Sequence, residues 1–130
     1  MIKTMLNNII SVFIGGGTGA VIRFLITMLS KKVFLTSVFG TFFINIFGCF
    51  LMGLAFAFFL NKINVSSESL KCFITVGFLG GLTTLSTLNV EVFEFFKSGR
   101  ILFAFLYLFL SCFVSLLTVC LGYWVYSFLK

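Results

Sequence analysis

The third long apolar stretch of the chain combines glycine and hydroxyl residues in a pattern that a regular helix does not favour. Two adjacent glycines are followed by four hydroxyl residues in the segment Gly80-Gly81-Leu82-Thr83-Thr84-Leu85-Ser86-Thr87. Hydroxyl groups compete for backbone hydrogen bonds, so the segment predicts a helix broken near mid-membrane. Freed carbonyl oxygens at such a break can coordinate a cation, and hydroxyls can donate hydrogen bonds to an anion. The alternative is a tightly packed helix whose hydroxyls bond back to the preceding turn.

The other three apolar stretches carry isolated polar side chains. Asn45 lies well inside the second stretch, where its amide either joins two helices or donates to a ligand in a pathway. Tyr107 and Ser111 lie four residues apart in the fourth stretch and therefore share one helix face. Arg23, late in the first stretch, either extends to the membrane surface or lines an aqueous entrance. Amide and hydroxyl donors of this kind suit a small, strongly hydrated anion, because they replace its water.

These polar residues lie within four stretches that are long and apolar enough to cross a membrane. The chain has 130 residues, of which 61% are hydrophobic and 9% charged, whereas a soluble domain has about 25% charged residues. A spanning helix needs about 20 mostly apolar residues. We therefore predict an all-α integral membrane protein with spans at 6–29, 36–60, 71–96 and 101–128. The short connections make residues 1–130 a single four-helix transmembrane domain.

The composition argues against several other classes of protein. The chain has no histidine, and no nucleophile–base pair, metal cluster or phosphate-binding loop is evident, so we do not expect an enzyme. The net charge of +6 comes from basic residues scattered between the spans, which does not favour nucleic-acid binding. We expect Glu91 and Glu94, late in the third span, to lie at the membrane surface, with Glu91 hydrogen-bonded locally. The four cysteines show no C-x-x-C spacing.

The basic residues are almost evenly divided between the two ends of the predicted spans. One side holds Lys3, Lys62, Lys71 and Lys130, and the other holds Lys31, Lys32, Lys97 and Arg100, with Arg23 nearby. Orientation in a membrane follows the asymmetry of Lys and Arg between the two sides. The near balance therefore predicts dual topology, in which oppositely oriented copies can pair. The alternative is a single orientation fixed by a determinant that the charges do not reveal.

Three segments together resemble the Fluc/CrcB family of fluoride channels. The first runs from Val12 through the glycines of Gly15-Gly16-Gly17-Thr18-Gly19 to Arg23, and the second is Gly40-Thr41 with Asn45 and Gly48. The third and most specific segment is Gly77-Phe78-Leu79-Gly80-Gly81-Leu82-Thr83-Thr84, continuing to Glu91. With the number of spans and the chain length, the resemblance covers almost the whole sequence.

The resemblance implies an antiparallel dimer with two pores, each lined by both subunits, and passive export of fluoride through the cell inner membrane. The partner is either a second copy or a paralogous subunit. The resemblance also implies a structural Na⁺ at the dimer centre, held by the main-chain carbonyls of Gly80 and Thr83. It places Arg23 near the wide mouth of the pathway. The implied polar lining of the pore comprises Asn45, Ser86, Thr87, Tyr107 and Ser111.

One feature of the family is missing at the third-span motif. The family has phenylalanines on either side of the Ser-Thr pair, and this chain has Leu85 and Leu88 there. The resemblance implies that the electropositive edges of those phenylalanine rings face fluoride. Leucine has no ring quadrupole, so this contact cannot be carried over to Leu85 and Leu88. Four phenylalanines lie near enough in the sequence pattern to raise the question of whether one of them substitutes, and spacing does not decide it: Phe42, Phe43, Phe47 and Phe78. We expect fluoride permeation to persist at a reduced rate.

Two other functions fit a small four-helix membrane protein. A proton-coupled multidrug exporter requires an ionisable group at membrane depth, and the first span has no acidic residue. A non-transporting subunit of a larger membrane complex is compatible with the glycine run, which reads as a helix-packing surface.

Overall fold

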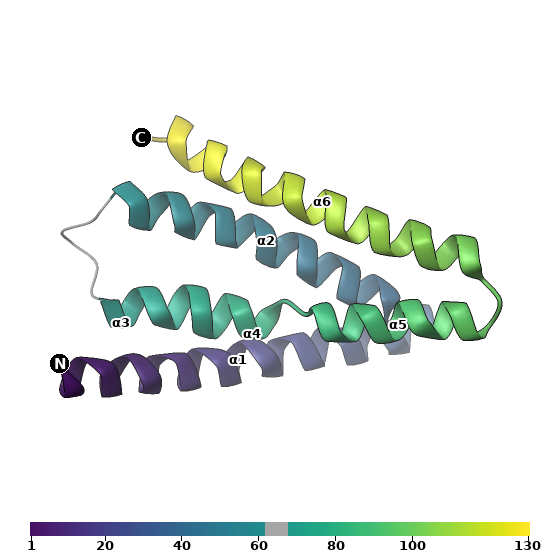
Figure 1. Ribbon diagram of the computed structural model, residues 1–130, viewed down its shortest axis with the longest axis horizontal. Coiled ribbons are helices and arrows are strands. Elements are labelled where there is room, and N and C mark those ends of the chain that lie inside the picture. Colours follow the sequence, from purple (N-terminus) through teal and green to yellow (C-terminus); the bar gives the residue numbers. More distant parts are fainter. Residues whose placement is uncertain (62–67) are drawn as a thin grey trace.

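The computed structural model describes residues 1–61 and 68–130, and within them the chain is helical apart from short turns. Its elements are α1 (Ile2–Phe34), α2 (Val38–Asn61), α3 (Glu68–Lys71), the π-helical segment η1 (Cys72–Leu79), α4 (Gly80–Leu82), α5 (Leu85–Lys97) and α6 (Ile101–Phe128). The segment from α3 to α5 forms one rod that runs in the same direction as α1, while α2 and α6 run back (Figure 1). Both termini therefore lie at one end of the bundle.

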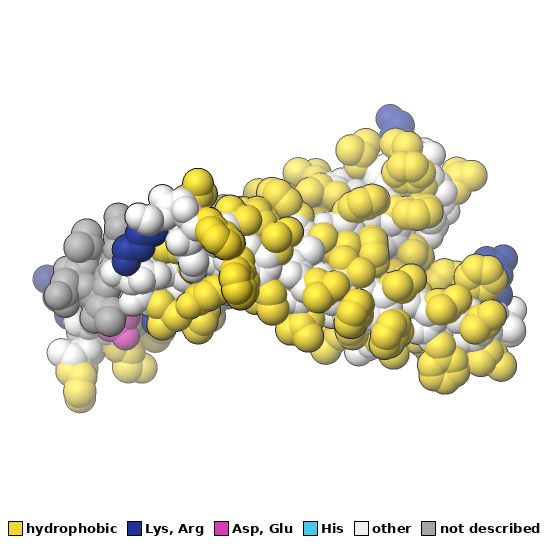
Figure 2. Space-filling model, turned by 90° about the horizontal axis from the view of Figure 1, so that it is seen from above, with side chains coloured by type: hydrophobic (Ala, Val, Ile, Leu, Met, Phe, Trp, Pro, Cys, Tyr) yellow, Lys and Arg dark blue, Asp and Glu magenta, His cyan; other side chains and the backbone are white. Residues whose placement is uncertain are grey.

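The prediction of four spans is confirmed in the part of the chain that the structure describes. Four helical rods are long and apolar enough to cross a membrane: Ile2–Phe34, Val38–Asn61, Glu68–Lys97 and Ile101–Phe128. The first rod extends beyond the predicted 6–29 at both ends, because Lys3, Lys31 and Lys32 continue the helix. Figure 2 shows hydrophobic side chains over most of the visible face, with Lys and Arg side chains gathered at the ends. Lys62, counted in the charge balance, lies outside the described residues.

Glycines bring α1 against the third rod at backbone distance. A Cβ added to Gly15 would lie 2.5 Å from the Phe73 carbonyl oxygen, and one added to Gly81 would lie 2.5 Å from the Gly16 carbonyl oxygen. These distances leave no space for a side chain, so the expected packing role of the glycine run is confirmed at Gly15. Gly17 behaves differently, because nothing lies within 4 Å of a Cβ placed there.

The turn between α1 and α2 is closed by one buried serine. The Ser30 hydroxyl donates to the Thr36 carbonyl oxygen at 2.8 Å and accepts from the Gly40 N–H at 2.9 Å. The Gly40 N–H belongs to the first turn of α2, whose amides have no partners within the helix. Leu35 takes a left-handed conformation, with φ 60°, that ends α1. Together these contacts hold the end of α1 beside the start of α2.

The third rod is interrupted between α4 and α5. The dihedral angles of Thr83 (φ −79°, ψ 155°) and Thr84 (φ −151°, ψ 119°) are those of extended chain. The helix resumes at Leu85, and Figure 1 shows the straightened segment between the two helices. The interruption therefore lies within the hydroxyl-rich segment of the sequence.

Candidate functional site

Asn45 fixes the interruption of the third rod to α2. Its Nδ2 donates to the Thr84 carbonyl oxygen at 3.0 Å, and its Oδ1 accepts from the Thr84 N–H at 2.8 Å. One side-chain amide thus bonds both polar groups of a single backbone residue, as a neighbouring strand would. Both residues are buried. We call this pair of bonds the Asn45–Thr84 clasp. It gives the Thr84 N–H, which makes no bond within α5, a partner in the buried interior.

The side chain of Thr84 begins α5. Its Oγ1 accepts from the Thr87 N–H at 3.2 Å, which is the bond expected of a residue at the N-cap. The same hydroxyl lies 3.2 Å from Ser86 Oγ and 3.0 Å from Thr87 Oγ1. The two predicted pore residues Ser86 and Thr87 are therefore brought together at the start of α5, within one hydroxyl cluster centred on Thr84.

Two carbonyl oxygens at the interruption lose the amide partners that a continuous helix would give them. The Thr84 N–H, four residues after Gly80, bonds to Asn45. The Thr87 N–H, four residues after Thr83, bonds to the Thr84 hydroxyl. The predicted sodium ligands, the carbonyls of Gly80 and Thr83, are thus the ones released by these two contacts. Backbone carbonyls at an unwound helix are hard oxygen donors that suit Na⁺. This donor set suits the sodium ion that the resemblance implies.

Glu91 joins three helices in the interior of the bundle. It is only 3% exposed. Its Oε1 accepts from the Thr41 hydroxyl of α2 at 2.9 Å, and its Oε2 accepts from the Tyr107 hydroxyl of α6 at 2.7 Å. The expectation of a local hydrogen bond is wrong for Glu91, because its partners come from two other helices. Glu94, one turn later, is exposed.

A cavity of about 210 Å³ lies beside the Asn45–Thr84 clasp, between α2, α5 and α6. Ser111 lines this inner cavity and is 2% exposed. Its hydroxyl oxygen meets hydrogen-bond geometry with no described residue, and its polar neighbour on the same helix face is Tyr107, one turn earlier. A buried hydroxyl without a partner is unfavourable, so this one is available to a ligand in the cavity. The full lining is Asn45, Cys49, Thr83, Thr84, Leu85, Leu88, Ser111, Cys112 and Ser115.

Leu85 and Leu88, which stand where the resemblance implies phenylalanines, both line the inner cavity. Leu88 is 2% exposed and packs with Val92 and Ala104, whereas Leu85 is 65% exposed. No phenylalanine is among the described residues around this cavity. Three of the possible replacements line a separate apolar groove of about 390 Å³: Phe43, Phe47 and Phe78. Within one subunit, none of these three rings takes the place of the missing pair.

A second polar cavity, of about 400 Å³, lies where α1 ends. Glu91 and Thr87 line this outer cavity. The cavity therefore reaches the face of α5 on which Thr87 bonds to Thr84 and Glu91 bonds to Thr41 and Tyr107. Arg23, predicted near the wide mouth, is half-buried and is not among its described lining residues. The lining consists of Thr27 and Lys31 of α1, Leu35, Thr36 and Ser37 of the following turn, and Thr87, Val90, Glu91 and Glu94 of α5.

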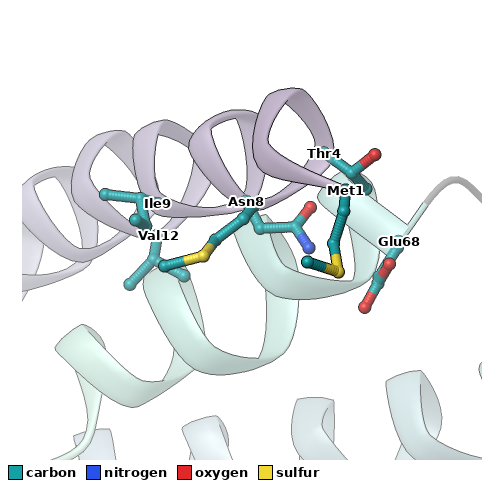
Figure 3. Close-up of a pocket in the computed structure, with 7 residues that line it drawn as sticks. Met1, Thr4, Asn8, Ile9, Val12 and Glu68 are labelled. Atoms are coloured by element: carbon teal, nitrogen blue, oxygen red, sulfur yellow. The ribbon is translucent and has the colours of Figure 1, made fainter.

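A further hollow lies at the opposite end, beside the N-terminus (Figure 3). Its volume is about 640 Å³, and its polar side chains are those of Thr4, Asn8 and Glu68. Asn8 also accepts a hydrogen bond of 2.8 Å from Ser69, which ties the start of α1 to α3. None of the predicted site residues lines this hollow, so we leave it out of the candidate site.

Comparison with known proteins identifies the family. A family model described as CrcB-like protein, Camphor Resistance (CrcB), matches residues 10–123. The chain is 38% identical over 123 residues to the fluoride-specific ion channel FluC of Escherichia coli O17:K52:H18, strain UMN026, which covers 95% of this chain and 96% of that protein. FluC of Shigella boydii serotype 18 gives the same identity and coverage. The chain belongs to the CrcB family. With its four apolar helices, this CrcB-family chain is a multi-pass membrane protein.

Sequence reasoning missed three residues of the candidate site in this CrcB-family chain. Thr84 was read only as part of a hydroxyl-rich motif, although its place before Leu85 is typical of an N-cap. Thr41 was part of a quoted motif without a predicted contact, and Glu91 was expected to form only a local hydrogen bond. A signal for Glu91 was present, because it lies four residues after Thr87 and therefore on the same helix face. Nothing in the sequence identified its partners on α2 and α6.

Proposed function

We propose that this chain is a fluoride-specific ion channel that lets fluoride leave the cytoplasm passively and so lowers its toxic concentration. The observation that carries the proposal is the 38% identity to FluC over 95% of the chain. The arrangement of the polar groups supports it. Buried hydroxyl and amide groups lie on α2, at the interruption before α5 and on α6: Thr41, Asn45, Thr84 and Ser111.

We propose that the conduction pathway follows this line of polar groups. It leads from the outer cavity past Glu91 and Tyr107 to Ser111 and the inner cavity. Hydroxyl groups along this line replace the water that fluoride gives up. No lysine or arginine lines the inner cavity in the described part of the chain. The anion is therefore not held by a full opposite charge, which favours rapid release. Ser86, Thr87 and Asn45 contribute where the third helix is broken at mid-membrane.

We propose an antiparallel dimer as the working unit. In the described residues, basic side chains lie at both ends of the helices, with Lys3, Lys71 and Lys130 at one end and Lys31, Lys32, Lys97 and Arg100 at the other. This balance supports insertion in both orientations. The many exposed apolar side chains of the helices can pack against lipid or against a partner. The exposure of Leu85 supports a pathway that is completed by a second subunit, whether a copy of this chain or a paralogue.

We propose that the carbonyls of Gly80 and Thr83 hold a structural sodium ion between the two subunits. The support is the loss of their helical amide partners to Asn45 and Thr84. When bound, the ion supplies a positive charge that neutralises the carbonyl dipoles at the interruption. The Asn45–Thr84 clasp keeps these carbonyls in position. Removal of the ion is expected to weaken the dimer rather than the subunit fold.

A proton-coupled multidrug exporter is the second candidate, and the burial of Glu91 is the observation that favours it. A buried carboxylate at membrane depth is the group such an exporter requires. Glu91 is, however, hydrogen-bonded by both Thr41 and Tyr107, and the curated relatives are named fluoride-specific channels. The fluoride channel is therefore the better-supported function.

Expression in a bacterium made sensitive to fluoride by loss of its own channel tests the proposal in cells. We expect the chain to restore growth in millimolar fluoride, on the order of the concentrations that inhibit the sensitive strain. The matched control is Asn45→Ala, which disrupts the candidate site. Growth equal to that of the empty strain, with the protein present in the membrane, contradicts the proposal. Resistance to cationic drugs without resistance to fluoride would favour the exporter instead.

A further inference from the structure

The outer cavity carries an unusual balance of charge for an entrance that passes an anion. Its lining includes Lys31 from the last turn of α1 and two carboxylates, Glu91 and Glu94, from α5. Lys31 and Glu94 are exposed, while Glu91 is buried at the inner end. The formal charge of this entrance is therefore negative by one unit, and Lys31 is the only cation among its described lining residues.

Two carboxylates at an entrance oppose a fluoride ion. An anion that approaches Glu94 and then Glu91 meets like charges in a cavity whose walls are partly apolar, where fields are less screened than in water. The Lys31 ammonium is the group that offsets this repulsion. Its stem extends from α1, and the cavity also contains hydroxyl donors from Thr27, Thr36 and Thr87. Neutral donors of this kind bind an anion, but they do not remove the long-range repulsion of two glutamates.

We propose that Lys31 sets the rate at which fluoride enters this pathway, because its positive charge offsets one of the two negative charges of Glu91 and Glu94 at the entrance. The inference rests on the proposed channel function. It assigns the entrance charge to Lys31 and not to Arg23, which is absent from the described lining of this cavity. The fluoride flux should therefore follow the formal charge of the entrance. Removal of the Lys31 charge should lower the flux, and removal of the exposed Glu94 charge should raise it.

The neighbouring lysine provides a matched control. Lys32 carries the same charge on the same turn of α1 and is also exposed, but it does not line the cavity. A general effect of surface charge on fluoride concentration near the membrane would appear equally in variants of both lysines. An effect of the entrance appears only in the Lys31 variant. Because Lys31, Lys32 and Glu94 are all exposed, neutral replacements should leave the fold intact.

The test is the single-channel fluoride current across planar bilayers, measured for Lys31→Gln, Glu94→Gln, the double variant and Lys32→Gln. A unit charge about 6 Å from the ion in water changes the local anion concentration about threefold. We expect the current of Lys31→Gln to fall about threefold and that of Glu94→Gln to rise by a similar factor at low ionic strength. The double variant has the native formal charge and should return to the wild-type current. Adding an impermeant salt on both sides should make the currents of all the variants similar, because the shorter Debye length screens the charges of the entrance.

Two results overturn the inference, and they are distinguishable. If the wild type conducts fluoride but Lys31→Gln and Lys32→Gln have equal currents, or if the two losses of charge do not cancel in the double variant, Lys31 does not set the entrance charge. If the wild-type dimer passes no fluoride, the proposed function fails and the inference fails with it. Elution of each purified variant as a dimer in detergent serves as the check on folding.

Discussion

Replacement of Asn45 by alanine should loosen the interruption of the third helix. The substitution removes two hydrogen bonds, of 3.0 Å and 2.8 Å, and leaves the Thr84 N–H and carbonyl without them in a buried position. An interhelical hydrogen bond in a membrane protein contributes about 0.6 kcal/mol on average and about 1.7 kcal/mol at most. Loss of both bonds should therefore lower the free energy of unfolding by about 1–3 kcal/mol.

A second variant separates the shape of Asn45 from its hydrogen bonds. Asn45→Asp keeps the size of the side chain and an acceptor for the Thr84 N–H. It replaces the Nδ2 donor, however, with an oxygen facing the Thr84 carbonyl oxygen. Two acceptors at that distance repel each other, so we expect this variant to lose at least as much stability as Asn45→Ala. Asn89→Ala is the matched control, because Asn89 is exposed on α5.

The measurement is reversible unfolding in mixed detergent micelles, followed by fluoride efflux from liposomes containing the same preparations. We expect both Asn45 variants to be less stable than Asn89→Ala and to conduct more slowly, because the position of Thr84 depends on the clasp. If both Asn45 variants unfold within about 0.5 kcal/mol of Asn89→Ala, the clasp does not hold the interruption, and the reasoning is refuted.

Three further substitutions test other contacts. Glu91→Gln should lower the free energy of unfolding by about 1.5–3 kcal/mol, because one of the two carboxylate oxygens becomes an NH₂ group that cannot accept from the hydroxyl facing it. In a double-mutant cycle with Tyr107→Phe the losses should not add, and additive losses would show that the two groups do not interact. Gly15→Ala should destabilise the protein in the same unfolding assay, because the new Cβ meets backbone atoms of the third rod. Gly17→Ala should be neutral or stabilising by up to about 1 kcal/mol, because nothing lies within 4 Å of its Cβ. Equal effects of the two variants would refute the packing account. Leu85→Phe should increase the fluoride current because Leu85 is exposed beside the inner cavity; an unchanged current would show that the missing ring does not limit conduction.

The number and positions of the spans could be predicted from the sequence, because a membrane helix is specified by the apolar residues of its own segment. Long apolar runs bounded by Lys, Asn and Arg predict membrane helices whatever their neighbours are, and the structure has helices at each of them. The glycine contacts of α1 could also be anticipated, since small residues allow close approach. The sequence could not show which glycines make these contacts, because Gly15 and Gly17 differ only in whether they lie on the helix face that meets the third rod.

The contacts of the candidate site depend on residues far apart in the sequence and could be predicted only in part. Asn45 was expected either to join helices or to line a pathway, and the structure shows it joined to Thr84, 39 residues later. The contact between Glu91 and Thr41 spans 50 residues, and no pattern in either segment specifies it. The exposed position of Leu85 and the burial of Leu88 likewise follow from how α5 packs, not from the motif that contains both residues.

The central claim is that this chain forms a fluoride channel, and the most direct test is efflux from liposomes that contain the purified protein. A fluoride electrode outside the vesicles records release after the membrane potential is relieved by an ionophore for the counter-cation. We predict fast, protein-dependent release of fluoride and no release of chloride under the same conditions. No fluoride release from a well-folded dimer, or release of both anions at similar rates, would contradict the account.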